Sequence, residues 1–352
     1  MDDKKSGFSP GSLWRSVKAR FYGNNFLLLL TFVLFVAMYG VGMIVFQDAH
    51  FDRFQVFLNM LMSNSGLIVI AAGMTMVLIT GGIDISVGSQ VALYCMMLAY
   101  MMERQGVNCY VAIAVVMVTG VVFGFVQGWL VSYLKIQPFI VTLAGMFFAR
   151  GMTAVITADT ISINNADFLG MVNATIEFPF GGYYNKAGKY MAPFIHPNVI
   201  LALIALAAVY IMLSRTRFGR NIYAIGGGEQ SSMLMGLNVR RTKLIVYTLN
   251  GFLAAFGGFL FCLNTAAGYV EQAKGFEMQA IAASVIGGTL LTGGVGNAIG
   301  SLVGVLIQAT IQSFITAIGT LSSWWTSIVI AALLCFFIVL QSVFSYIRSK
   351  RK

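Results

Sequence analysis

Charge is scarce in this sequence. Only 10% of its 352 residues are Asp, Glu, Lys or Arg, whereas 58% are hydrophobic, and the mean hydropathy is +0.83. A soluble domain carries about a quarter charged residues. Proline is also rare, with five residues, but glycine is abundant, with 38. The composition excludes a soluble globular domain and predicts an all-α polytopic membrane protein.

Motifs for nucleotides and metals are missing as well. There is no GxxxxGK[ST] phosphate loop, and the pair Gly188-Lys189 is followed by Tyr190. The triple glycine at 226–228 lies in a polar loop, which argues against a dinucleotide site. Four widely separated cysteines and two histidines form no metal-binding pattern. We therefore expect no cofactor, no metal and no catalytic residues in this chain.

Ten hydrophobic runs are candidates for transmembrane helices. The third, fifth and eighth are short or interrupted, which indicates broken or re-entrant segments. We expect a single transmembrane domain over 26–346. The ten runs cover residues 26–46, 56–80, 85–102, 110–133, 137–157, 194–213, 244–264, 276–292, 298–318 and 324–346.

Basic residues are unevenly divided between the two sides of these runs. With a cytoplasmic amino terminus, sixteen lysines and arginines lie inside and five lie outside. By the positive-inside rule, segment 1–25, loop 214–243 and the basic tail 347–352 face the cytoplasm, and loop 158–193 faces outward. The basic residues are spread over several loops, which indicates contact with anionic lipid rather than with nucleic acid.

Glycines spaced by four residues indicate close helix packing, either within the chain or at a dimer face. One ladder lies in the fourth run and one in the ninth. The two sets are Gly120, Gly124 and Gly128, and Gly296, Gly300 and Gly304.

A short internal echo indicates two related halves. The segment TGGIDISVGS at 80–89 is followed 212 residues later by TGGVGNAIGS at 292–301, with identical or isosteric residues at seven of ten positions. Paired glycine-interrupted segments in two halves are typical of transporter substrate sites.

Two ionisable residues stand out within the runs, where charge is costly. Asp84 follows a Gly-Gly break; it is either an acid at the start of the next helix or a group near a translocation path. Arg150 is interpreted as an anchor to backbone carbonyls or to an acid. Amides and hydroxyls suit a hydroxyl-rich solute, although each can also bond a neighbouring helix. The candidates for a translocation path are Asn59, Asn64, Asp84, Ser86, Gln90, Gln137, Thr142, Gln308 and Gln312.

Four ordered motifs resemble a known family. They are GMTMVLITGGIDISVGS (73–89), QPFIVTLAGMFFARG (137–151), RTRFGRNIYAIGG (215–227) and ASVIGGTLLTGGVGNAIGS (283–301). Together they resemble the permease subunits of bacterial ATP-binding-cassette (ABC) importers for ribose, xylose, arabinose and galactose. The tail at 319–341 is most similar to a permease of galactofuranose importers.

The resemblance implies a monosaccharide permease of the bacterial inner membrane. Its implied partners are a second permease, with a heterodimer favoured over a homodimer, a sugar-binding protein and a cytoplasmic ATPase that binds ATP and Mg. The alternative is a stand-alone secondary carrier or facilitator for small polar solutes.

The resemblance also gives loop 214–243 a role. In this family the loop carries a coupling helix that docks on the ATPase, with the pattern Glu-Ala-Ala, three residues, then Gly. Here Gln230 replaces the acid, or Glu229 displaces it by one position. An ordinary surface loop is the alternative. The residues assigned to coupling are Glu229, Gln230, Ser231, Ser232, Met233, Leu234, Gly236 and Leu237.

Loop 158–193 combines glycines with aromatic residues. Such a surface suits either recognition of a sugar-binding protein or an aromatic belt at the membrane interface. The aromatic residues are Phe178, Phe180, Tyr183, Tyr184 and Tyr190.

Overall fold

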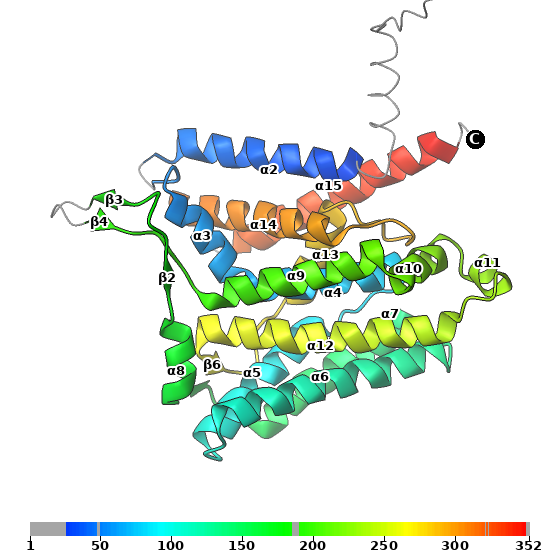
Figure 1. Cartoon of the computed structure of the whole chain (residues 1–352), viewed down its shortest axis with the longest axis horizontal. Helices are drawn as coiled ribbons and strands as arrows, with labels where there is room; N and C mark the ends of the chain where they lie inside the picture. Colours follow the sequence, from blue (N-terminus) through cyan, green and yellow to red (C-terminus); the bar gives the residue numbers. More distant parts are fainter. Residues whose placement is uncertain (1–25, 48–49, 185–189, 321, 323, 350–352) are drawn as a thin grey trace, which may run out of the picture.

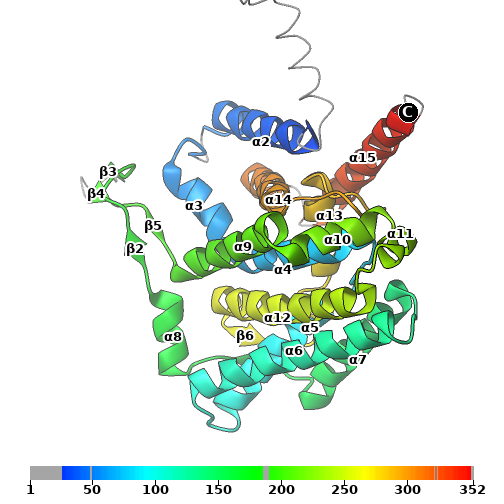
Figure 2. The ribbon, with the colours of Figure 1, turned by 45° about the vertical axis from the view of Figure 1, so that its right-hand side comes forward.

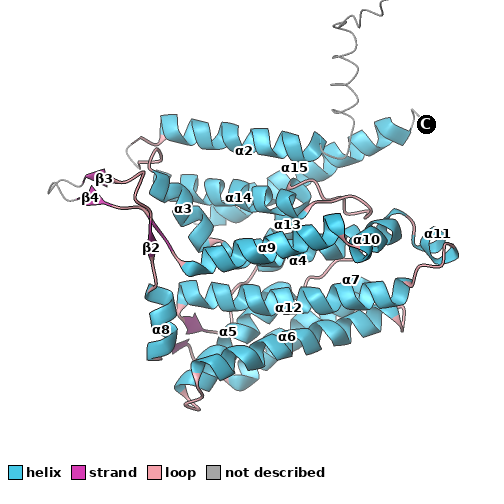
Figure 3. Cartoon of the chain, viewed as in Figure 1, coloured by secondary structure: helices cyan, strands magenta, loops and turns pink. Residues whose placement is uncertain are grey.

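The computed structural model describes residues 26–47, 50–184, 190–320, 322 and 324–349. The expected segment 1–25 and the last three residues of the basic tail lie outside the described residues. The described chain is mostly helical, and its longer helices run nearly parallel to one another, with α2 at one edge of the molecule and α6 towards the other (Figures 1 and 3).

A helix covers each of the ten hydrophobic runs. They are α2 (Phe26–Val45), α3 (Phe54–Ser63) with α4 (Ser65–Ile79), α5 (Val87–Glu103), α6 (Cys109–Ser132), α7 (Pro138–Ile156), α9 (Pro197–Arg215), α12 (Val239–Thr265), α13 (Phe276–Ile286), α14 (Ala298–Ile318) and α15 (Trp324–Ser349).

Not all of these helices are long enough to cross a membrane. Among the described residues, six meet the length and hydropathy required, and α3 and α4 make a seventh if the pair, bent by 59°, counts as one span. Helix α13 has only 11 residues because Gly287 and Gly288 end it. The structure therefore confirms a polytopic helical protein but does not confirm ten crossings.

The core is built around α4. All 15 of its residues are buried, which fits a helix that is apolar on every side. It contacts α9, α12, α13 and α14, so other helices surround it. The outer helices instead expose apolar side chains such as Val33, Phe125 and Phe148, as lipid-facing surfaces do.

Helix α6 packs closely on α12 through its glycine ladder. A Cβ at Gly120 or Gly124 would collide with the α12 backbone, and one at Gly128 would lie 2.8 Å from the carbonyl oxygen of Leu244. This ladder therefore lies at a contact within the chain.

The second glycine ladder is only partly helical. Gly300 and Gly304 face α13, where a Cβ would collide with the carbonyl oxygens of Gly287 and Ala283. Gly296 lies before the first residue of α14, so the prediction that this whole ladder lies in the ninth helical run was wrong.

The outside segment was expected as a loop but contains regular structure. Its described part holds α8 (Ala166–Asn173) and two-residue strands that pair antiparallel with each other or with strands outside the segment, so the chain is not entirely α-helical. These strands lie at the opposite end of the bundle from α10 and α11 (Figure 1). The pairs are β1 (Ile161–Ser162) with β6 (Ala267–Gly268), β2 (Ile176–Glu177) with β5 (Phe194–Ile195) and β3 (Tyr183–Tyr184) with β4 (Tyr190–Met191).

Candidate translocation path and coupling site

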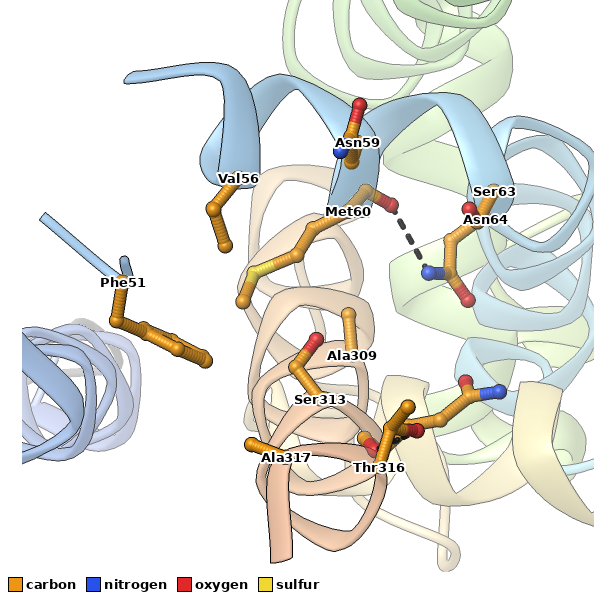
Figure 4. A pocket seen from close by; sticks show the side chains of 11 residues that line it. Phe51, Val56, Asn59, Met60, Ser63, Asn64, Ala309, Ser313, Thr316 and Ala317 are labelled. Carbon is orange, nitrogen blue, oxygen red and sulfur yellow. Dashed lines mark hydrogen bonds between the residues drawn. The ribbon is translucent and has the colours of Figure 1, made fainter. Parts of the chain in front are cut away.

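A cavity of about 350 Å³ with both polar and apolar lining residues opens between α3 and α14 (Figure 4). The junction of α3 and α4 supplies Asn64, which ends α3 and whose Nδ2 donates to the carbonyl oxygen of Met60 at 2.9 Å. Helix α14 supplies Gln312 and Thr316, while Phe51 forms part of an apolar wall. The cavity thus combines amides and a hydroxyl with an aromatic side chain.

A second cavity of about 380 Å³ shares Asn64, Gln312 and Thr316 with the first. Gln308 reaches it from α14 and is 3% exposed. Its Nε2 donates to the carbonyl oxygen of Gln279 at 3.1 Å, but its Oε1 has no hydrogen-bond partner among the described residues. An unsatisfied buried acceptor costs about 1–3 kcal/mol, so a hydroxyl of a ligand or a water molecule at this point would be stabilising.

The two cavities adjoin at these three shared residues, and we call them together the amide tract. It is lined by residues of α3, α13, α14, α15 and the α3–α4 junction. No ionisable side chain lies among its described lining residues. A neutral ligand rich in hydroxyl groups matches this lining, because a carboxamide both donates and accepts hydrogen bonds.

Asp84 lies elsewhere, in a buried hydrogen-bond network. Its Oδ1 accepts from the backbone N of Ser86 at 2.9 Å, and its Oδ2 accepts from Nδ2 of Asn250 at 2.7 Å. The amides of Gln90 and Gln127 donate to the Ser86 hydroxyl. Ser86, not Asp84, is the N-cap residue of α5. The network connects the break after α4 to α6 and α12.

The nine predicted path residues are therefore not brought together. Asn59, Asn64, Gln308 and Gln312 line the amide tract, whereas Asp84, Ser86 and Gln90 belong to the buried network. Gln137 is exposed at the start of α7, and the hydroxyl of Thr142 donates to the carbonyl oxygen of Pro138 at 2.9 Å.

Sequence reasoning missed Glu277, the second residue of the eighth run. Its Oε2 is buried without a hydrogen-bond partner among the described residues. It lies against Gly88 at the start of α5, where a Cβ would collide with Oε2. An acid inside a hydrophobic run was the signal that should have added it to Asp84 and Arg150.

Arg150 is an anchor, as its sequence position indicated. Its Nη1 donates to the carbonyl oxygens of Val270 and Gln272, the latter at 2.9 Å. It therefore holds the loop before α13.

Among the described residues, no three His, Cys, Asp or Glu side chains cluster as metal ligands.

The two echoed segments meet in space. The backbone N of Gly294 donates to the carbonyl oxygen of Ile79 at 2.8 Å, and Gly81 and Gly293 both have positive φ, at 77° and 87°. A Cβ at Gly226 would collide with the same Ile79 oxygen and with Gly294. We call these five residues the glycine junction; it joins both breaks to the loop that precedes α12.

That loop folds into α10 (Arg217–Gly227) and α11 (Glu229–Leu234). The first of these was not predicted, although Ile222 and Ile225 are buried on one face of it. Thr216 caps it by accepting from the backbone N of Gly219 at 3.1 Å, and Tyr223 donates to the carbonyl oxygen of Gly296 at 2.8 Å. Helix α10 thus lies between the bundle and α11 (Figure 2).

Helix α11 begins at Glu229, whose carboxylate pairs with Lys243 at 2.6 Å. The chain turns after it at Gly236, where φ is 82°. Leu234 is 84% exposed and Met235 is 69% exposed.

The exposed apolar residues at and after α11 differ from those that the sequence assigned to coupling. Leu237 is half-buried, so Met235 takes its place beside Met233 and Leu234. Gln230 and Ser231 are exposed, whereas Ser232 is buried. Because Glu229 is paired within the chain, its carboxylate anchors α11 to α12.

Residues 56–338 match the family described as the permease component of the branched-chain amino acid transport system. The chain belongs to this permease family. Over 318 residues the permease is 40% identical to the inner membrane ABC transporter permease protein YjfF of Escherichia coli strain K12, covering 90% of the chain and 92% of the relative.

Other relatives of the permease are named as sugar import permeases. The fructose import permease protein FruG of Bifidobacterium longum strain NCC 2705 is 33% identical over 316 residues, or 89% of each chain. The ribose import permease protein RbsC of Escherichia coli strain K12 is 36% identical over 280 residues, or 78% of this chain and 82% of the relative. No solved structure matches the permease significantly.

Proposed function

We propose that this permease forms the translocation path of an ATP-driven importer for a monosaccharide, galactofuranose or a related pentose or hexose, in the bacterial inner membrane. The amide tract is the observation that supports this proposal most strongly. Its lobes of about 350 and 380 Å³ have the size of small-ligand sites, and their described lining carries amides and hydroxyls without ionisable groups. The relatives named for fructose and ribose import support the same class of substrate.

We infer that all ten hydrophobic segments lie at membrane depth. In this arrangement α3 and α4 form one bent span, and α13 is too short to be a full span. Irregular backbone at that depth is tolerated where protein buries it, and the network around Asp84 is buried in this way. Both termini and loop 214–243 are on the cytoplasmic side, as the excess of basic residues requires.

The partner ATPase binds ATP and Mg and docks on α11. The exposed side chains of Met233, Leu234 and Met235 offer it an apolar contact, as a short helix does in a groove. Motion of α11 would pass through α10 to the glycine junction, where Gly226 touches both breaks. A second permease, related in sequence, completes the path as a heterodimer.

The sugar-binding protein docks on the outside segment 158–193. The side chain of Gln55 on α3 both accepts from the backbone N of Phe194 at 2.8 Å and donates to its carbonyl oxygen at 3.2 Å. Arg53 lies 3.8 Å from the ring centroid of Tyr183, an attractive cation–π contact. Docking on this segment would therefore act on α3, which lines the amide tract.

Reconstitution separates this proposal from a stand-alone carrier. The permease is placed in vesicles alone, or with the ATPase, the second permease and the binding protein. We expect uptake of labelled sugar with the complete set and ATP, and none with the permease alone. Uptake by the permease alone would establish the carrier instead.

A further inference from the structure

An apolar groove of about 320 Å³ runs along the surface between α9 and α12, which lie side by side (Figures 1 and 2). Every residue that lines it is apolar. Helix α9 contributes a stripe from Leu201 to Met212 that includes the small residues Ala205 and Ala208. The small side chains leave room that larger ones would fill.

The groove has the length of a lipid chain in one leaflet. The 11-residue separation of Leu201 and Met212 corresponds to about 16 Å along a helix. Half of a hydrocarbon core is roughly 15 Å thick. The length of the groove along α9 therefore matches one acyl chain.

Two arginines follow the groove residues along α9 and α12 at one end. The three- and four-residue spacing of the α9 stripe continues from Met212 to Arg215, and steps of four back from Leu249 on α12 reach Arg241. Both arginines are exposed. Neither forms an ion pair within the part of the chain that the structure describes, whereas Lys243 is already paired.

We propose that this groove binds one anionic phospholipid, with an acyl chain between α9 and α12 and its phosphate on Arg215 and Arg241. Guanidinium groups bind phosphate through paired hydrogen bonds, and basic residues at the membrane surface favour anionic over zwitterionic headgroups. The lipid joins the two helices from which the α10–α11 loop begins and ends. The bound lipid therefore stabilises the two helix ends that flank that loop.

Native mass spectrometry of the purified, delipidated permease tests this site. Phosphatidylglycerol and phosphatidylcholine with identical acyl chains are titrated separately. We expect one phosphatidylglycerol to bind about tenfold more tightly than phosphatidylcholine. The double variant Arg215→Ala and Arg241→Ala should lose this preference. Arg240→Ala is the matched control, because Arg240 is exposed on the opposite face of α12.

A second variant tests the groove itself. Ala208→Trp places a large side chain in the groove and should remove the bound lipid, with near-normal thermal unfolding as the check on folding. Equal binding of the two lipids, or equal effects of Arg240→Ala and the double variant, would overturn the proposal. So would an Ala208→Trp variant that keeps the lipid but no longer co-purifies with the second permease, since the groove would then be a subunit contact.

Discussion

The buried amide of Gln308 can accept a hydrogen bond from a ligand. Its Oε1 lies at the amide tract without a hydrogen-bond partner among the described residues. We expect Gln308→Leu to leave the free energy of unfolding nearly unchanged, because removal of the buried unsatisfied acceptor offsets the loss of the hydrogen bond from Nε2 to Gln279. Sugar uptake by the complete importer should fall about tenfold, the loss expected for one hydrogen bond.

The control for this variant is Gln137→Leu, because Gln137 is exposed at the start of α7 and lines neither cavity. Thermal unfolding and uptake are measured for both variants. A Gln308→Leu protein that transports normally would show that this amide does not contact the sugar.

The close packing of α6 on α12 at Gly124 can be tested by substitution. Its position against the α12 backbone leaves no room for a side chain. We expect Gly124→Val to lower the free energy of unfolding by about 1–3 kcal/mol. Gly151→Ala is the control, since nothing lies within 4 Å of a Cβ there. Equal melting temperatures for the two variants would contradict the packing described for α6.

At this scale the sequence predicts which residue types matter better than it predicts which distant residues contact one another. The spacing of Gly120, Gly124 and Gly128 indicates close packing because a helix fixes which residues share a face. The division of Gln90 from Gln308 could not be predicted, because it depends on which distant helices meet. Glu277 was missed although its position inside a hydrophobic run was visible.

Helix α11 is the element that our proposal assigns to coupling with the ATPase. Leu234 is 84% exposed, so Leu234→Asp should leave folding unchanged. It should reduce co-purification of the ATPase about tenfold, because a charge replaces an apolar anchor. Leu234→Met should retain the complex. If the Asp variant co-purifies as well as the Met variant, α11 is not the docking element.

Helix α10 is the element that joins α11 to the two breaks. Gly226→Ala adds a Cβ that collides with the carbonyl oxygen of Ile79, whereas Gly227→Ala meets nothing within 4 Å. We expect only the first variant to lower ATP-driven uptake, with ATPase binding retained in both. Equal uptake by the two variants would show that the glycine junction does not transmit motion.

The sequence predicts where the long helices lie but not how distant segments bend or pair. Hydropathy located all ten helical segments to within several residues, because long apolar runs have few alternatives to helix. The bend at Asn64 and the pairing of β2 with β5 were not predicted. Both depend on contacts between segments far apart in the chain.

The two ends of the molecule are formed by different elements. The α10–α11 loop and the end of α15 lie at one end, and β3 and β4 lie at the other (Figure 1). We expect a membrane-impermeant maleimide to label Phe180→Cys in intact spheroplasts and to label Met235→Cys only in inverted vesicles. The exposed Cys335 is first replaced by Ala. Reversed labelling would invert the proposed orientation.

The amide tract as the sugar path is the central claim, and blockage at one position tests it most directly. Gln312→Cys is made in a permease whose four native cysteines are replaced, assembled with its partners and treated with a methanethiosulfonate reagent. We predict that modification stops ATP-driven uptake, that the transported sugar slows modification, and that Gln137→Cys shows neither effect. Full modification of Gln312→Cys with undiminished uptake would contradict the account.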